Sequence, residues 1–262
     1  MAKKKATVQD WLYRIVFVIA LAVFLVAAAM LIYYFVLYRK GSSEYEDLQQ
    51  YVTIVDSGES IEDTESTEQE PFRVDFDALQ AKNPDCVAWI YFENLGISYP
   101  VMQGEDNDYY LTHTFEGQQV TAASIFMDYR NAADFTDDNT FVYGHNMKDK
   151  TMFGKLRGYT DKGFYEENPC FYIYKPDYIY RYDIFSCYLG AVEEEELFSL
   201  SFDTKEDYQA YLDRIGWKAA YDTGVEVTAD DRIVTLMTCH TAGHEYRYFV
   251  HGVLADIQPV TE

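Results

Sequence analysis

Hydrophobic residues in this chain form one long uninterrupted block near the N-terminus and then many short runs. The block covers residues 15–38 and contains no charged side chain. A helix of this length crosses the roughly 30 Å hydrocarbon core of a bilayer. Basic residues flank the block, with more on its N-terminal side: Lys3, Lys4, Lys5 and Arg14 before it, and Arg39 and Lys40 after it. The pattern predicts a single-pass transmembrane anchor at residues 15–38, with residues 1–14 in the cytoplasm and the remainder outside the cell.

A cleaved secretory signal is the alternative interpretation of the same block. The block is longer than the usual apolar region of a signal peptide, and it lacks a clear exit of small residues. It also ends in Tyr33, Tyr34 and Tyr38, the type of residue that gathers at membrane interfaces. These features favour a retained anchor.

The segment after the block is polar and acidic. Residues 41–70 are rich in Ser, Glu, Asp and Thr, and contain no Lys or Arg. Few of these residues suit a core, so the pattern predicts a solvated extracellular stalk over residues 39–70. The folded domain is then expected to cover residues 71–262.

From residue 71 the hydrophobic positions fall into short runs separated by turn residues, the spacing typical of a mainly β barrel or sandwich. Strands are predicted at 87–92, 98–102, 124–127, 140–143, 170–174, 178–188, 232–238 and 246–254. An amphipathic segment at 72–82 opens the domain. A helix is predicted at 205–218, with Asp203 and Glu206 as a capping box.

Charge excludes one class of partner. The formal net charge is -23, and the body of the sequence has no basic stripe. Nucleic-acid binding is built on a basic face, so no nucleic-acid partner is expected.

The four cysteines do not have metal-ligand spacing. Cys86, Cys170 and Cys187 lie in apolar, strand-like surroundings, which favours buried free thiols, although a disulfide outside the cell is the alternative. Cys239 differs because it stands where an apolar strand ends and a polar loop begins. A scaffold presents reactive side chains at such positions.

A cysteine nucleophile needs an acid–base partner and a group that stabilises the oxyanion. His145 follows a predicted strand and a glycine, and Arg247 opens the strand after the Cys239 loop. His244 is a rival for the base, while His240 points to the opposite face from Cys239 if the strand continues. Cys239, His240 and His244 also suggest a metal cluster, but no fourth ligand lies nearby, so neither a metal nor another cofactor is predicted.

Several segments resemble class B sortases, in the same order along the chain. The sortase nucleophile motif TLxTC is similar to Thr235-Leu236-Met237-Thr238-Cys239, and the histidine segment is similar to Tyr143-Gly144-His145-Asn146-Met147. Four more segments share the resemblance: Asn83-Pro84-Asp85-Cys86-Val87-Ala88-Trp89-Ile90, Tyr99-Pro100-Val101-Met102-Gln103, Asp106-Asn107-Asp108-Tyr109-Tyr110-Leu111 and Ser124-Ile125-Phe126-Met127-Asp128-Tyr129-Arg130-Asn131. The resemblance as a whole spans residues 72–257.

The resemblance implies an eight-stranded sortase barrel and a cysteine transpeptidase. Cys239 would attack a sorting-signal peptide to form a thioacyl enzyme, and an amine of a cell-wall precursor would resolve it. His145 would act as acid and base, and Arg247 with the backbone N–H of His240 would hold the oxyanion. Peptide contacts are implied at five further positions: Asn107, Leu111, Leu197, Phe198 and Met237.

Two features depart from some relatives, and two other functions stay open. His240-Thr241 replaces acidic residues after the nucleophile, and Glu193–Glu196 forms an acidic run in the loop expected to border the peptide groove. The alternatives are an extracellular cysteine protease, in which water resolves the thioester, and an inactive binding module on a stalk. The resemblance implies a Gram-positive cell membrane as the location.

Overall fold

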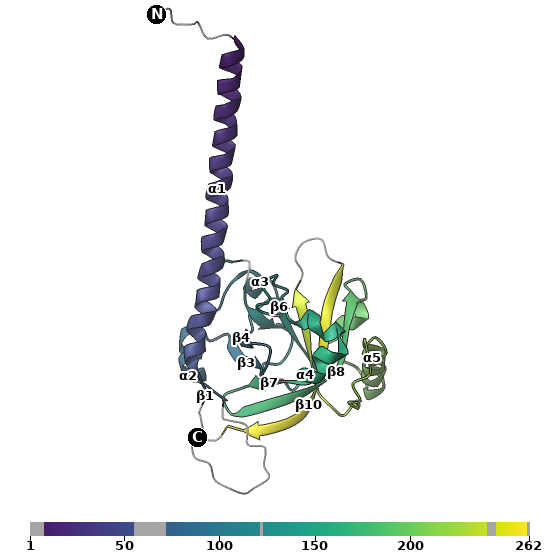
Figure 1. Ribbon diagram of the computed structural model, residues 1–262. Helices are drawn as coiled ribbons and strands as arrows, with labels where there is room; N and C mark the ends of the chain where they lie inside the picture. The colour runs from purple at the N-terminus through teal and green to yellow at the C-terminus, as the bar shows by residue number, and fades with distance from the viewer. Residues whose placement is uncertain (1–7, 55–71, 121–122, 240–244, 261–262) are drawn as a thin grey trace, which may run out of the picture.

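The computed structural model describes residues 8–54, 72–120, 123–239 and 245–260. Its body is a closed barrel with the strand order β10-β8-β7-β3-β4-β5-β6-β9 (Figure 1). The strands are β3 (Cys86–Phe92), β4 (Ile97–Met102), β5 (Ile125–Met127), β6 (Asn139–His145), β7 (Cys170–Tyr174), β8 (Tyr178–Ala191), β9 (Ile233–Cys239) and β10 (Tyr246–Pro259). The eight strands predicted from the sequence are therefore all present, and the mainly β barrel is confirmed.

Two of the barrel contacts are parallel, and one of them joins β6 to β9. All seven residues of β6 are buried, because apolar side chains cover both faces of this strand. We call this parallel contact between β6 and β9 the seam. Next to it, β9 pairs antiparallel with β10, and β10 pairs antiparallel with the long strand β8. The C-terminal ends of β6 and β9 consequently lie at the same edge of the barrel.

Short helices connect the strands. They are α2 (Phe76–Lys82), α3 (Tyr109–Thr112), η2 (Leu156–Thr160), α4 (Lys162–Glu167) and η3 (Glu195–Phe198). The longer helix α5 (Lys205–Trp217) lies on the side of the barrel away from α1 (Figure 1). Its apolar stripe, Tyr208, Tyr211, Leu212 and Ile215, is buried as predicted.

The predicted cap of α5 was wrong by one residue. Thr204, not Asp203, is the N-cap, and its side-chain oxygen accepts a hydrogen bond from the backbone N–H of Asp207. The Asp207 carboxylate in turn accepts a bond from the Thr204 hydroxyl. Thr204 has the extended backbone of an N-cap, which places its short side chain against the open N–H groups of the first turn.

Helix α1 (Val8–Leu48) continues beyond the apolar block as one long rod, and its last turns run along the barrel (Figure 1). The apolar part is long and hydrophobic enough to cross a membrane. The solvated stalk expected after residue 40 is not observed over residues 41–54. Instead Glu44, Tyr45 and Leu48 are buried, with Tyr45 5% and Leu48 2% exposed.

The reason is a set of specific contacts that composition alone does not reveal. The Tyr45 hydroxyl donates to the carbonyl of Ala123, and its ring meets Tyr99 edge to face. The Glu44 carboxylate accepts the backbone N–H of Glu116 at 2.7 Å. After η1 (Gln49–Tyr51), strand β1 (Val52–Ile54) pairs with β2 (Phe72–Val74), so the predicted opening segment 72–82 begins as a strand and becomes helical only in α2.

Candidate active site

The seam between β6 and β9 brings two of the predicted catalytic residues together. In the parallel register of these strands, His145 is the direct partner of Cys239, and both are the last residues of their strands. Residues so paired lie on adjacent strands, about 5 Å apart in the backbone. Strand pairing therefore brings together two residues that are 94 positions apart in the sequence.

The third predicted residue lies on the other side of β9. Strand β10 pairs with β9 so that Phe249 faces Met237, and the next contact is a hydrogen bond from the Tyr248 backbone N–H to the Thr238 hydroxyl at 3.1 Å. The pairing of β10 with β9 ends here, and Arg247 lies two residues before Phe249 on β10, toward the end of β9 that carries Cys239. The Arg247 side chain is half-buried, and its Nη1 donates to the Tyr246 carbonyl at 3.2 Å. Cys239 thus has His145 on one neighbouring strand and Arg247 on the other.

His145 is held in place by a backbone carbonyl. Its side chain is 8% exposed, and Nε2 lies 2.8 Å from the carbonyl oxygen of Leu111. Because a carbonyl only accepts, this contact requires the proton on Nε2 and leaves Nδ1 as the nitrogen that can gain or lose a proton. Burial lowers the pKa of His145, and the bond to Leu111 opposes this only in part, so the neutral ring is favoured.

A glycine allows the segment after β6 to pack closely on the end of this strand. A Cβ added to Gly144 would meet the Phe153 ring at 2.6 Å, so only glycine allows Phe153 to cover the strand at this point. The Phe153 backbone N–H then bonds the His145 carbonyl at 3.0 Å. The loop between them folds back on the strand and fixes the backbone of His145.

The five predicted peptide contacts fall on both sides of the seam. Leu111 and Asn107 lie beside β6: Leu111 binds His145, and Asn107 donates to the Asp128 carboxylate at 2.9 Å. Met237 is the register partner of Tyr143, and it is 8% exposed. Phe198 packs edge to face on Phe249. Leu197 is fully buried against Gly190, the strand partner of Arg247.

Comparison with known proteins agrees with this geometry. A family model described as Sortase domain matches residues 90–255. Sortase B of Staphylococcus aureus is 34% identical over 207 residues, which cover 79% of this chain and 81% of that protein. Sortase B of Listeria monocytogenes is 40% identical over 163 residues, 62% of this chain and 66% of that protein. The chain belongs to the sortase family.

Solved structures support the same assignment. Sortase B from Bacillus anthracis superimposes with a TM-score of 0.70 at 34% identity, covering 84% of this chain and 98% of that one. A Staphylococcus aureus sortase B–substrate complex gives a TM-score of 0.66 at 34% identity, covering 71% and 85%. The protein is therefore a class B sortase, and sortases are cysteine transpeptidases.

The sortase contains a buried polar network beside the seam that sequence reasoning missed. Asp128 is fully buried and binds Arg130 through two hydrogen bonds of 2.8 Å each. Its carboxylate also accepts bonds from Tyr143 at 2.7 Å and Asn107 at 2.9 Å. Burial alone would raise the pKa of Asp128, but these bonds outweigh burial and lower it to about 2.

The network links Asn107, a predicted peptide contact, to the strand that carries the predicted catalytic histidine His145. Tyr143 lies two residues before His145 on β6 and shares its face of the strand. An acid and an arginine two residues apart after an apolar strand were the only signals in the sequence of this sortase. Their partner Tyr143 is identified only once β5 and β6 are paired.

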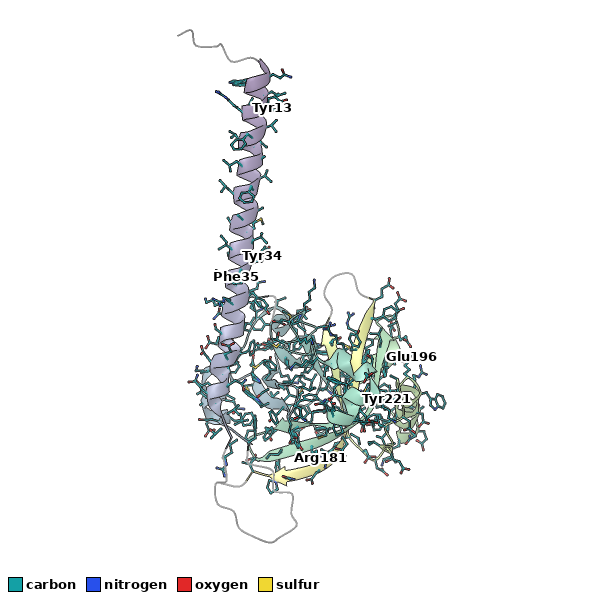
Figure 2. The ribbon with its side chains drawn as sticks, in the orientation of Figure 1. Tyr13, Tyr34, Phe35, Arg181, Glu196 and Tyr221 are labelled. Atoms are coloured by element: carbon teal, nitrogen blue, oxygen red, sulfur yellow. The ribbon has the colours of Figure 1, made fainter. Side chains whose placement is uncertain are left out.

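The acidic run of the sortase is partly neutralised. The Glu194 carboxylate pairs with Lys218 and that of Glu196 pairs with Arg214 of α5 (Figure 2 labels Glu196). These ion pairs tie η3 and the loop before it to the neighbouring helix α5.

The remaining histidines and cysteines separate into described and undescribed positions. His240 and His244 lie outside the described residues, and so does the predicted backbone donor of His240. Cys86, Cys170 and Cys187 are free thiols, and burial raises the pKa of Cys86 and of Cys187 to about 12. Over residues 8–54, 72–120, 123–239 and 245–260, no group of three or more His, Cys, Asp or Glu side chains is arranged around a metal position.

Proposed function

We propose that this sortase cleaves a sorting-signal peptide through a thioacyl intermediate on Cys239 and transfers the acyl group to an amine of a cell-wall precursor. The observation that supports the proposal is the strand arrangement: His145 is the register partner of Cys239 on β6, and Arg247 lies on β10, the other neighbour of β9. A nucleophile flanked by an acid–base group and by a cation is the arrangement that acyl transfer requires.

In the first half of the reaction the Cys239 thiolate attacks the carbonyl carbon of the scissile peptide bond. The C–S bond forms, and the carbonyl electron pair moves to oxygen. The Arg247 guanidinium donates hydrogen bonds to this oxyanion, with the His240 backbone N–H proposed as a second donor. Protonated His145 then gives its proton to the leaving nitrogen, and the C–N bond breaks to leave a thioester.

In the second half the amine of the cell-wall precursor attacks the thioester. Neutral His145 removes a proton from the amine as the new C–N bond forms. The oxyanion collapses, the C–S bond breaks and Cys239 leaves as thiolate. Burial lowers the pKa of His145, which favours the neutral base needed here and makes the protonated acid of the first half a minority state.

The five positions beside the seam are proposed to bind the peptide. Asn107 and Leu111 would form one wall, next to His145, and Met237 with Phe198 the other. Because Leu197 has no exposed surface in this state, its contact with a peptide requires the η3 loop to move. The substrate class comes from the relatives, one of which is described as a sortase B–substrate complex.

We further propose that residues 15–38 anchor the enzyme in the cell membrane of a Gram-positive bacterium. Residues 1–14 would then be cytoplasmic, and the catalytic domain, residues 71–262, would act outside the cell. The exposed apolar surface of α1 supports this, since Val23, Phe24 and Leu31 are 65%, 67% and 72% exposed in the absence of lipid.

Mass spectrometry with a library of sorting peptides tests the proposal. We expect an acyl adduct on Cys239 that is released faster when an amine nucleophile is added, and no adduct in Cys239→Ala. His145→Ala should be nearly inactive, whereas His240→Ala and His244→Ala should keep most activity. An adduct released equally fast with and without amine would indicate a protease, and no adduct with any peptide would indicate a binding module.

A further inference from the structure

A groove lies between residues 31–38 of α1 and the barrel, and it reaches the candidate active site at His145. It has a volume of about 1330 Å³ and is lined on one side by residues of α1 between Leu31 and Tyr38. The barrel side is formed by Leu111, Thr112, Gln119, Val120 and His145. The residues of α1 that form one wall therefore belong to the segment predicted to lie in the membrane.

The length of α1 indicates how deep this groove lies. Residues 15–38 extend for about 36 Å as a helix, at about 1.5 Å per residue. Because the hydrocarbon core is about 30 Å thick, the last turn of the segment reaches into the headgroup layer. Tyr38 lies in this turn, and Tyr33 and Tyr34 lie in the turn before it (Figure 2 labels Tyr34). Tyrosine is favoured near the interface because its ring is apolar and its hydroxyl is polar.

A hydrogen bond places part of the barrel at the same depth. The Tyr38 hydroxyl donates to the carboxylate of Asp149, which lies in the loop directly after β6. Asp149 is flanked by the exposed residues Lys148 and Lys150. The hydrogen bond therefore brings these two lysines close to Tyr38, and Arg39 and Lys40 follow Tyr38 directly on α1. A group of cations at this depth suits contact with the anionic phosphate groups of lipids.

A continuous helix links the apolar block of α1 to the barrel. The helix is continuous from residue 8 to residue 48, and its last turns are fixed by the buried side chains Glu44, Tyr45 and Leu48. The helix is unbroken between the apolar block and these contacts. The orientation of the barrel relative to the membrane is thus set by the helix.

We propose that the rim formed by Leu111, Thr112, Gln119 and Val120, together with the Lys148–Lys150 loop, rests in the phospholipid headgroup layer of the membrane that α1 crosses. The groove then opens to the bilayer surface and leads to His145, so the active site receives its substrates at the interface and not from bulk solvent. The inference rests on the proposed anchoring of α1, and the rim would be a membrane contact in addition to it.

Depth measurement by spin labelling tests the proposal on the full chain in vesicles of phosphatidylcholine and phosphatidylglycerol. A nitroxide is attached at Gln119→Cys, which is exposed in the groove, in a chain carrying Cys170→Ser and Cys239→Ala. The other two cysteines are buried and unreactive. Collisions with oxygen, which concentrates in lipid, are compared with collisions with a water-soluble nickel chelate.

Two matched labels give the reference depths. Phe24→Cys lies in the middle of the apolar block, and Trp217→Cys lies on α5, where the side chain is 87% exposed. We expect the ratio of oxygen to nickel collisions at residue 119 to be several times that at residue 217, and below that at residue 24. Equal ratios at 119 and 217, with a high ratio at 24, would overturn the proposal while leaving the anchor in place. A low ratio at 24 would overturn both.

A flexible insertion examines the role of the helix. Gly-Ser repeats placed between Lys40 and Gly41 would preserve the barrel contacts of Tyr45 and Leu48 but uncouple them from the membrane segment. We expect the label at residue 119 to become as accessible to nickel as the label at residue 217. An unchanged depth after the insertion would overturn the claim that continuity of α1 holds the rim at the membrane.

Discussion

At the scale of single residues, the proposed role of Arg247 depends on the geometry of its guanidinium group and not only on its positive charge. A planar guanidinium donates two directed hydrogen bonds, which a lysine ammonium does not reproduce in the same arrangement. If Arg247 binds the oxyanion, Arg247→Ala should lower the rate of acylation roughly a hundredfold to a thousandfold, and Arg247→Lys should recover only part of this. Single-turnover acylation with a sorting peptide measures both.

The pH dependence of Cys239 alkylation distinguishes the other roles of Arg247. If the cation only lowered the thiol pKa, lysine would restore most of the rate, and the alanine variant would need a higher pH for alkylation. If Arg247 only held a surface ion pair, both variants would acylate normally and differ from the parent by less than about 1 kcal/mol in stability. Normal acylation in Arg247→Ala would rule out the oxyanion role.

A second residue-scale prediction concerns His251 and acid stability. This histidine is fully buried between the Thr235 hydroxyl at 2.9 Å and the Tyr188 hydroxyl at 3.1 Å. Burial lowers its pKa to about 3, well below the value near 6.5 in the unfolded chain. Between these two values the unfolded chain binds a proton that the folded chain does not, so stability falls as the pH falls.

From this one group we expect the free energy of unfolding to drop by about 2 kcal/mol between pH 7 and pH 5, and to be unaffected by it above pH 7. His251→Gln should be less stable at every pH but should show a smaller drop. Urea unfolding of both proteins at the two pH values measures the difference. An identical drop in the variant would mean that His251 is not the titrating group.

At the scale of elements, the packing at the end of β6 depends on one glycine. In Gly144→Ala the new methyl group would overlap the Phe153 ring, which lies 2.6 Å from that position. Overpacking of this kind costs about 1 to 3 kcal/mol. Because the strain falls one residue before His145, acylation should slow as well, and both effects are measurable by urea unfolding and single-turnover assays.

Gly216→Ala is the matched control, since nothing lies within 4 Å of a Cβ at that position in α5. Alanine in a helix is favoured over glycine by up to about 1 kcal/mol, so this variant should be as stable as the parent or slightly more stable. Equal stability of Gly144→Ala and Gly216→Ala would show that the Phe153 contact relaxes without cost.

At the scale of the whole molecule, the contacts after residue 40 predict where the chain can be shortened. A chain beginning near Pro71 should still fold and cleave peptide, because all barrel strands follow that point. A chain beginning at Gly41 keeps Tyr45 and Leu48 in place and should be more stable by about 3 kcal/mol, since burying one large apolar side chain contributes about 1.5 to 3 kcal/mol. Equal urea midpoints for the two chains would show that these contacts add nothing.

The sequence by itself determined the strands, because alternating and aromatic-rich runs report local burial and turn residues mark their ends. It also singled out Cys239, His145 and Arg247, through motifs whose chemistry is local. The single-residue error at the cap of α5 has the same origin: Asp203 and Thr204 both suit an N-cap, and only the backbone conformation selects Thr204.

Tertiary structure alone decided what depends on distant partners. The buried Asp128 carboxylate accepts a hydrogen bond from Tyr143, which lies 15 positions away in the sequence. His145 is oriented by the carbonyl of Leu111, which lies 34 positions away. The burial of Tyr45 depends on residues near 99 and 123, so an acidic segment that composition assigns to solvent packs on the barrel. The local sequence pattern indicates whether a side chain is suited to burial. The pairing of the strands and the path of α1 determine which distant residues that side chain contacts.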